Sequence, residues 1–410
     1  MASPGLTEAP AAAARGAFLA GAATLAALYV GNNVPSALYA LLRTTFGFSA
    51  LVQTLLYAVA VAVIVPALLV AGPLSDTVGR RPLMLFGLGA FLLGDVVFAL
   101  ATGTGWLFAA RVLQGLGMGA GAAAAQAMLN DSAGQDALGQ RRASRTATAC
   151  VTFGLALGPL AAGLLAQYGP LPRQLSFVVH AVAVAVVALL VLRTSRPARP
   201  AGARRRRPRL GVPPVVRRTF VIAGASSFLA WAVLGMFSAV VPSLVSGLLG
   251  TANLAVAAGA LTLMIATSGV VQFGAGRLAP TAAQASGLLV LAAGLALLVV
   301  ADEAGLAWLV VPAMLGTGTG HGLVFTGALH ELTTVTPPAE RGAVIGSYYV
   351  VSYLGLGGPV IGVGLLSLAR GLSAATVLVA AVVGGCCLVL APLVFLEIRR
   401  RGAASADDPQ

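Results

Sequence analysis

Residues 50–101 read ALVQTLLYAVAVAVIVPALLVAGPLSDTVGRRPLMLFGLGAFLLGDVVFALA. Two long apolar runs, 50–71 and 82–101, flank a short loop that holds Asp76, Arg80 and Arg81. A helix that crosses the hydrocarbon core of a bilayer needs about 20 predominantly apolar residues. Each run is long enough to cross, and the loop leaves room only for a tight connection. The stretch therefore predicts a membrane-spanning helical hairpin, and similar runs recur along the chain.

The composition of the whole chain agrees with this hairpin. Of the 410 residues, 58% are hydrophobic and 9% are charged, whereas a soluble domain carries about 25% charged residues because its surface faces water. This excludes a soluble enzyme, a nucleic-acid-binding module and a disordered chain. We expect an all-α polytopic membrane protein, with twelve transmembrane helices in two pseudo-symmetric six-helix bundles. The expected spans are 16–38, 50–71, 82–101, 105–127, 145–168, 174–194, 218–242, 252–276, 283–301, 305–329, 341–366 and 372–396.

The arginines predict how the chain is threaded. With both termini in the cytoplasm, 21 of the 25 basic residues fall in cytoplasmic segments, and Arg43, Arg111, Arg173 and Arg370 do not. Basic residues collect in cytoplasmic loops because their translocation is unfavourable. This topology accounts for the net charge of +13, so we expect the lipid bilayer and no nucleic acid as a partner. The expected location is the cell inner (plasma) membrane, multi-pass, with both termini cytoplasmic.

One long hydrophilic stretch, residues 195–217, divides the chain into two halves. It is rich in Arg and Pro, and we expect it to anchor the topology near anionic lipid heads, with a regulatory contact as the alternative. Cys150, Cys386 and Cys387 lie in apolar runs, which predicts packing residues rather than a disulfide or a metal site. The expected parts are a cytoplasmic tail (1–15), an N-terminal bundle (16–194), a cytoplasmic linker (195–217), a C-terminal bundle (218–396) and a second cytoplasmic tail (397–410).

The two halves repeat each other in sequence. Gly158-Pro159 and Gly358-Pro359 are 200 residues apart, as are Arg141 and Arg341. A ladder of glycines at 115, 117, 119 and 121 recurs at 316, 318, 320 and 322, an offset of 201. Two parallel repeats imply a pseudo-twofold axis along the membrane normal. That symmetry predicts a cavity between the halves, exposed alternately to each side as one half rocks against the other.

The loop GPLSDTVGRRP, residues 72–82, has the features of a specific turn. We expect Gly72 to let helix backbones approach closely, Gly79 to permit the turn, and Asp76 to meet Arg80 or a helix N-terminus. Together with Arg81, these residues resemble the loop signature of the major facilitator superfamily. The resemblance implies that the loop is a gating latch for one face of a transport cycle. Thr77 departs from the pattern, which usually has a basic residue there.

Two further signatures extend the resemblance. Arg111, Gln114 and Gly115 in RVLQGLGMGAG (111–121) resemble the superfamily's span-four signature. Gly154, Gly158, Pro159 and Gly163 in GLALGPLAAG (154–163) resemble the span-five signature of its twelve-helix drug–proton antiporters. Glycines at 154 and 158 would form a groove for a neighbouring helix, and Pro159 would free a backbone carbonyl.

Few ionisable residues lie inside the predicted spans, and these are the candidates for carrying a proton. Asp95 and Arg111 each lie six residues from the outer ends of a predicted hairpin, so they should sit at similar depth. We hypothesise an Asp95–Arg111 ion pair that responds to protons, the alternative being a purely structural pair. His321, within the second glycine ladder, is another candidate carrier. Span one has Asn32 and Asn33 where many drug exporters have an acid, which leaves proton antiport open.

The superfamily resemblance also implies a central substrate cavity. Its polar and aromatic candidates are sparse and nearly uncharged, which suits a small hydrophobic or weakly polar solute better than a phosphate or dicarboxylate. We expect a monomeric, proton-coupled exporter with no cofactor and no enzymatic activity; a metabolite or sugar importer or facilitator and a transport-dead sensor remain alternatives. The candidates are Asn32, Asn33, Gln53, Gln126, Trp231, Gln272, His321, Tyr348, Tyr349 and Tyr353.

Overall fold

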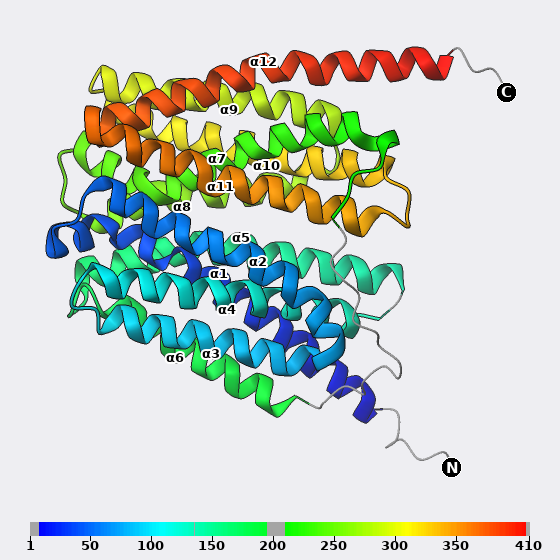
Figure 1. Cartoon of the computed structure of the whole chain (residues 1–410), viewed down its shortest axis with the longest axis horizontal. Helices are drawn as coiled ribbons and strands as arrows, with labels where there is room; N and C mark the ends of the chain where they lie inside the picture. Colours follow the sequence, from blue (N-terminus) through cyan, green and yellow to red (C-terminus); the bar gives the residue numbers. More distant parts are fainter. Residues whose placement is uncertain (1–7, 135, 195–209, 407–410) are drawn as a thin grey trace. The chain divides into compact units, whose positions relative to one another are not determined.

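The computed structural model describes residues 8–134, 136–194 and 210–406, and within these ranges every regular element is helical (Figure 1). Twelve of the described helices are long and apolar enough to cross a membrane, which confirms the predicted fold class. The side chains that face outward from these helices include many large apolar residues, such as Phe86, Leu93 and Val389. The chain is therefore a multi-pass membrane protein.

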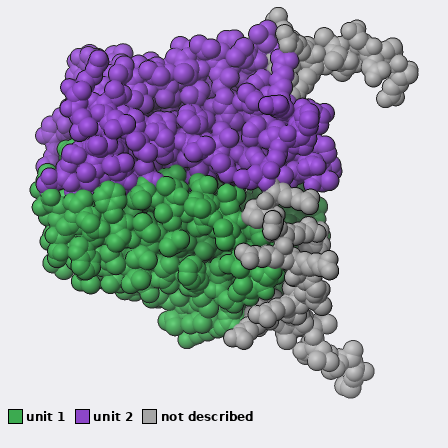
Figure 2. All heavy atoms as spheres, in the orientation of Figure 1, with its two compact units in different colours: residues 1–46, 59–208 green, residues 47–58, 209–410 purple. Residues whose placement is uncertain are grey.

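The chain forms two compact units, which Figure 2 colours separately. Unit 1 comprises residues 1–46 and 59–208, and unit 2 comprises 47–58 and 209–410, so helix α2 is divided between them. The first six helices are α1 (Glu8–Phe46), α2 (Ala50–Val78), α3 (Arg80–Ala99), α4 (Thr104–Ser132), α5 (Ala137–Tyr168) and α6 (Leu175–Arg193). The other six are α7 (Arg217–Leu248), α8 (Leu254–Ala275), α9 (Pro280–Glu303), α10 (Val310–Val335), α11 (Arg341–Arg370) and α12 (Leu372–Ala406).

Several helix ends differ from the sequence prediction. Helix α1 begins at Glu8, inside the segment expected to be a tail, and α12 continues to Ala406. Helix α10 begins at Val310, because Gly305 adopts a positive φ of 66° and the short 3-10 helix η2 (Ala307–Leu309) follows it. A second 3-10 turn, η1 (Pro214–Val216), leads into α7. Apolar runs measure only the lipid-embedded part of a helix, so helical residues beyond the lipid are missed. Residues 195–209 of the expected linker lie outside the described residues.

The internal repeat is visible in the packing of each unit. In unit 1, α1 packs against α4, α5 and α6, and α3 packs against α4 and α6. In unit 2, α7 packs against α10, α11 and α12, and α9 packs against α10 and α12. The second set is the first shifted by six helices, as expected for two six-helix repeats.

The register of the repeat corrects one sequence prediction. A β-carbon at Gly94 or at Gly294 would press on α4 or α10 respectively, which gives an offset of 294 − 94 = 200. A β-carbon at Gly115 would press on α2, and its counterpart facing α8 is Gly318, an offset of 318 − 115 = 203. The glycine ladders are therefore aligned by 203 and not by 201, because the connection that contains η2 is longer than the one between α3 and α4.

The expected groove on α5 receives α1. A β-carbon at Gly158 would lie 2.2 Å from the Val30 carbonyl oxygen, and one at Gly154 would lie 2.9 Å from the β-carbon of Tyr29. The second half does not repeat this feature at Gly358, where a β-carbon meets no described atom within 4 Å. There α7 and α11 approach closely at Gly235 and Gly355 instead.

This difference gives a matched prediction. We expect Gly158→Ala to lower the free energy of unfolding by about 1–3 kcal/mol, because the new methyl group overpacks a contact made by backbone. Gly358→Ala, at the repeat-related position, should leave stability unchanged. Thermal unfolding of the purified variants in detergent measures both, and equal midpoints for the two variants would contradict the α1–α5 packing described here.

Candidate functional site

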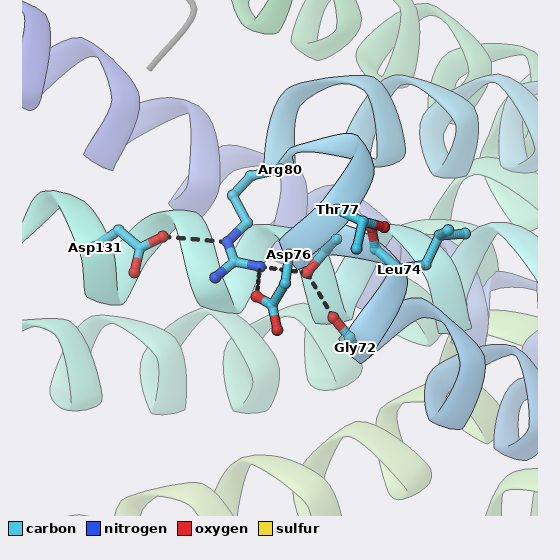
Figure 3. A network of polar contacts seen from close by, with 7 residues as sticks. Gly72, Leu74, Asp76, Thr77, Arg80 and Asp131 are labelled. Atoms are coloured by element: carbon cyan, nitrogen blue, oxygen red, sulfur yellow. Dashed lines mark hydrogen bonds and ion pairs between the residues drawn. The ribbon is translucent and has the colours of Figure 1, made fainter. Parts of the chain in front are cut away.

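The loop between α2 and α3 is organised around Arg80, as Figure 3 shows. Helix α2 ends at Val78, and Gly79 reverses the chain with a φ of 102°, a conformation that side chains disfavour. One Arg80 nitrogen, Nη1, donates to Asp76 Oδ1 and to Ser75 Oγ, each at 2.5 Å. Its Nε donates to Asp131 Oδ2 at 3.1 Å, so Arg80 joins the end of α2 to the end of α4.

The contacts of Arg80 hold the loop in position but contribute little to the free energy of folding. The Asp76 and Asp131 side chains are 47% and 59% exposed, and exposed ion pairs contribute roughly 0–1 kcal/mol. Arg81 also donates to the Leu192 carbonyl of α6. The close backbone approach expected at Gly72 is not made within unit 1, where no described atom lies within 4 Å of a β-carbon built there. Gly72 lies near the end of α2, past the part of the helix that packs against α4.

A second polar group lies buried inside unit 1. Asp95 on α3 is fully buried and Arg111 on α4 is 1% exposed, although charged residues inside a span are costly. Gln114, one turn after Arg111, joins the two: its Nε2 donates to Asp95 Oδ1 at 2.9 Å, and its Oε1 accepts from Arg111 Nη1 at 3.1 Å. Arg111 Nη1 also donates to the Asn32 carbonyl of α1 at 3.2 Å.

The direct Asp95–Arg111 ion pair expected from the sequence is therefore corrected. The ionisable residue that contacts Asp95 is His180 on α6, whose Nδ1 lies 2.6 Å from Asp95 Oδ2. A hairpin places α3 beside α4, but α3 packs against α6 as well. His180 was missed, although it is the one ionisable residue in the apolar run 175–192.

The contacts of His180 fix where protons lie. Its Nε2 is 2.9 Å from the Ala27 carbonyl oxygen, which can only accept, so Nε2 carries a hydrogen. Nδ1 faces a carboxylate oxygen at 2.6 Å, and two lone pairs at that distance would repel. One further proton must therefore lie between Nδ1 and Oδ2, on either atom. The pair holds a dissociable proton in a position shielded from water.

Asn33, expected to line the cavity, is used in packing. Pro159 has no N–H, so the carbonyl of Leu155, four residues earlier, lacks its helical partner. Asn33 Nδ2 donates to that carbonyl at 3.1 Å, and Ser36 Oγ donates to Asn33 Oδ1 at 3.3 Å. The amide of Asn33 thus compensates the break in α5.

In unit 2, the aromatic candidates come together on α7, α10 and α11. The Trp231 ring centroid is 5.0 Å from that of Tyr353, 5.7 Å from that of Phe325 and 6.5 Å from that of Tyr349. Tyr348 packs beside Tyr349 at 5.9 Å. We call these five residues the aromatic cluster; Phe325 was not among the sequence candidates, although it lies one turn after His321.

The remaining predicted residues include His321, which contacts the aromatic cluster, and Gln53 and Gln126, which do not belong to it. His321 stacks against Phe325 at 6.3 Å, and its Nδ1 is 2.7 Å from Ser268 Oγ, which accepts from Gln272 Nε2 at 3.2 Å. Gln53 donates to the Ala239 carbonyl at 2.7 Å, a contact within unit 2. Gln126 donates to Asn130 on its own helix. Most candidates thus belong to a buried charged group in unit 1 or to an aromatic group in unit 2, and Gln53 and Gln126 lie outside both groups.

The chain that carries the buried charged residues and the aromatic cluster is similar to known proteins in sequence and in fold. Residues 19–359 match the sequence model of the Major Facilitator Superfamily. The chain belongs to the Major Facilitator Superfamily. The family and the fold together make this chain a transporter and not an enzyme. The Arg80 loop and the Arg111–Gln114 pair are the positions at which its sequence resembles the superfamily signatures.

Curated relatives match this superfamily transporter over short segments. Multidrug resistance protein D of Escherichia coli (strain K12) is 35% identical over 94 residues, which cover 23% of this chain and 22% of that protein. The vesicular acetylcholine transporter of Rattus norvegicus is 30% identical over 143 residues, which cover 35% of this chain and 26% of that protein. The matched segments thus span about a quarter of the length of these relatives.

Solved structures match over nearly the whole superfamily fold. A bacterial homologue of the human lysosomal transporter Spinster superposes with a TM-score of 0.73 at 16% identity, covering 93% of this chain and 96% of the other. A structure from the proton-dependent oligopeptide transporters superposes with a TM-score of 0.71 at 16% identity, covering 94% and 99%. At this identity the likeness establishes the shared fold.

Proposed function

We propose that this transporter exports a small hydrophobic or weakly polar compound in exchange for protons by alternating access. The observation that carries the proposal is the 2.6 Å contact between Asp95 and His180, which joins α3 to α6 and, through Gln114 and Arg111, to α4 and α1. A site that binds a proton where four helices meet can link proton binding to helix movement. The partial similarity to multidrug resistance protein D supports export.

The charges indicate how the proton would act. With the proton bound, Asp95, His180 and Arg111 carry one negative and two positive charges in the ionic form. When the proton leaves to water, Asp95 and Arg111 balance, and the unprotonated Nδ1 of His180 no longer attracts the carboxylate. The carboxylate of Asp95 would then lower its electrostatic energy by turning towards Gln114 and Arg111, because opposite charges attract strongly in a low-dielectric interior. Proton release would thereby loosen α6 from α3 and tighten α3 on α4.

The remaining parts of the proposal follow the topology. We place both termini and the Arg80 loop on the cytoplasmic side of the plasma membrane, with the loop acting as a latch on one state of the cycle. The transporter acts as a monomer, and the substrate passes between the two six-helix halves. Breaking the exposed Arg80 contacts would cost little, which suits a latch that must open in every cycle.

The test is transport by the purified protein in liposomes. An imposed pH gradient should drive uptake of substrate against its concentration gradient, and substrate added without a gradient should drive proton movement in the opposite direction. Exchange that proceeds equally with and without a gradient would overturn proton coupling and would favour the alternative of a metabolite or sugar facilitator. The absence of an acid in the Asn32–Asn33 region of α1 is the observation that keeps this alternative in view.

A further inference from the structure

The aromatic cluster of unit 2 has two features that a simple apolar core lacks. Trp231, Phe325, Tyr349 and Tyr353 are only partly buried, so part of the cluster lies open. Among the described residues, three buried atoms at this cluster have no hydrogen-bond partner: Nε1 of Trp231, Nε2 of His321 and the hydroxyl of Tyr348. A buried polar group without a partner costs about 1–3 kcal/mol, so three of them at one cluster require an explanation.

The hydrogen bonds of His321 show which kind of group is missing. Ser268 Oγ accepts from Gln272, so its own hydrogen has one acceptor available, Nδ1 of His321 at 2.7 Å. A neutral imidazole that accepts at Nδ1 carries its hydrogen at Nε2. Trp231 Nε1 is always a donor. Both unpartnered nitrogens are therefore N–H groups that lack an acceptor, and the Tyr348 hydroxyl can donate to an acceptor as well.

The surrounding charges decide between a neutral ligand and a cation. Aromatic faces attract cations, but two unpartnered N–H groups present partial positive charge and would repel one. Helices α7, α8 and α11 contain no acid. On α10, Glu331 lies six residues beyond Phe325 and ten beyond His321, about 9 Å and 15 Å along the axis at 1.5 Å per residue. A cation bound beside Trp231 and His321 would therefore find no carboxylate close to it on these four helices.

We propose that the aromatic cluster binds a neutral, flat aromatic compound whose carbonyl or ether oxygens accept hydrogen bonds from Trp231 and His321. The rings of Trp231, Tyr353 and Phe325 would contact the faces and edges of the ligand, and the two N–H groups would orient it. This inference names the substrate class of the proposed exporter and rests on that proposal for its role in transport.

The test compares two probes of the same shape on the full-length protein in nanodiscs. Acridone is neutral and has a carbonyl oxygen, whereas 10-methylacridinium has the same three rings, a positive charge and no acceptor. We expect acridone to bind saturably and at least about tenfold more tightly, since about 1.4 kcal/mol, the order of one hydrogen bond, is tenfold in affinity. Equal binding, tighter binding of the cation, or no binding of either would overturn the proposal.

Variants locate the site. Trp231→Phe keeps a ring and removes the N–H, and should weaken acridone binding about tenfold while changing methylacridinium little. Trp308→Phe, at a tryptophan that is 68% exposed and outside the cluster, is the matched control and should bind normally. Unchanged acridone binding in Trp231→Phe would overturn the assignment, and the probe comparison on the unaltered protein does not depend on any variant folding. Binding is measured without a pH gradient, so loss of proton-driven transport alone would leave this result standing.

Discussion

Asp95→Asn is expected to abolish transport driven by a pH gradient while exchange of substrate without a gradient continues. Asparagine can donate to Nδ1 of His180 from its amide nitrogen and accept from Gln114 with its oxygen, so both contacts of Asp95 are kept. It cannot release the proton. The introduced amide is neutral and so is His180 beside it, which leaves Arg111 as the one charge and equals the net charge of the proton-loaded group. The variant should therefore fold and remain in the loaded state.

The expected size follows from the coupling that is lost. Without a proton to exchange, the pH gradient no longer drives the substrate uphill, so the internal substrate concentration should fall to the concentration outside. The measurement is substrate accumulation in proteoliposomes with and without a pH gradient, beside counterflow at equal pH. Asp302→Asn, an acid-to-amide change near the exposed end of α9 whose carboxylate accepts from Ser373, is the matched control. Full coupling in Asp95→Asn would rule out the Asp95–His180 pair as the proton site.

His180→Asn tests the other half of the same pair. Without the imidazole, Asp95 keeps its bond to Gln114 but loses the group that shares its proton. We expect coupling to fail here as well, whereas a purely structural Asp95 would tolerate the change with no shift in gradient dependence. Normal coupling in His180→Asn together with failure in Asp95→Asn would assign the proton to Asp95 alone.

The helices and their repeat were predictable because they follow from local features of the sequence. A run of about 20 apolar residues is long enough to span a bilayer wherever it occurs, and an offset between repeated motifs needs no knowledge of contacts. The burial of Asp95 and Arg111 was predictable for the same reason. The partner of Asp95 was not, because periodicity gives the depth of a residue and does not show which of two packed helices its side chain faces.

The packing role of Asn33 is a second case in which the sequence did not show which helix a side chain contacts. Its position in span one made it a cavity candidate, and the freed carbonyl behind Pro159 was also anticipated. That the two meet depends on the rotation of α1 against α5, which is set by the glycine contacts at 154 and 158. Glycine spacing predicts that a helix approaches, but the approaching helix and its register come from the three-dimensional packing.

Gly31→Ala is expected to eliminate proton coupling as completely as Asp95→Asn, although it changes no ionisable group. A β-carbon at Gly31 would lie 2.1 Å from Cε1 and 2.6 Å from Nε2 of His180, and 2.5 Å from Cε1 of Phe91. The imidazole is held at both nitrogens, by Asp95 and by the Ala27 carbonyl. It cannot move away from the new methyl group without giving up one of these contacts, and either loss removes the position of the shared proton.

The control for this substitution lies on the same helix. Gly16→Ala should have no effect, since no described atom lies within 4 Å of a β-carbon at Gly16, whereas Gly31→Ala should also lower the free energy of unfolding by about 1–3 kcal/mol through overpacking. A double-mutant cycle separates the two effects: in a His180→Ala background the clash with the imidazole is gone and only the contact with Phe91 remains, so the stability cost of Gly31→Ala should fall while coupling stays absent. Gly31→Ala protein that accumulates substrate normally under a pH gradient would show that the His180 position set by α1 does not matter for coupling.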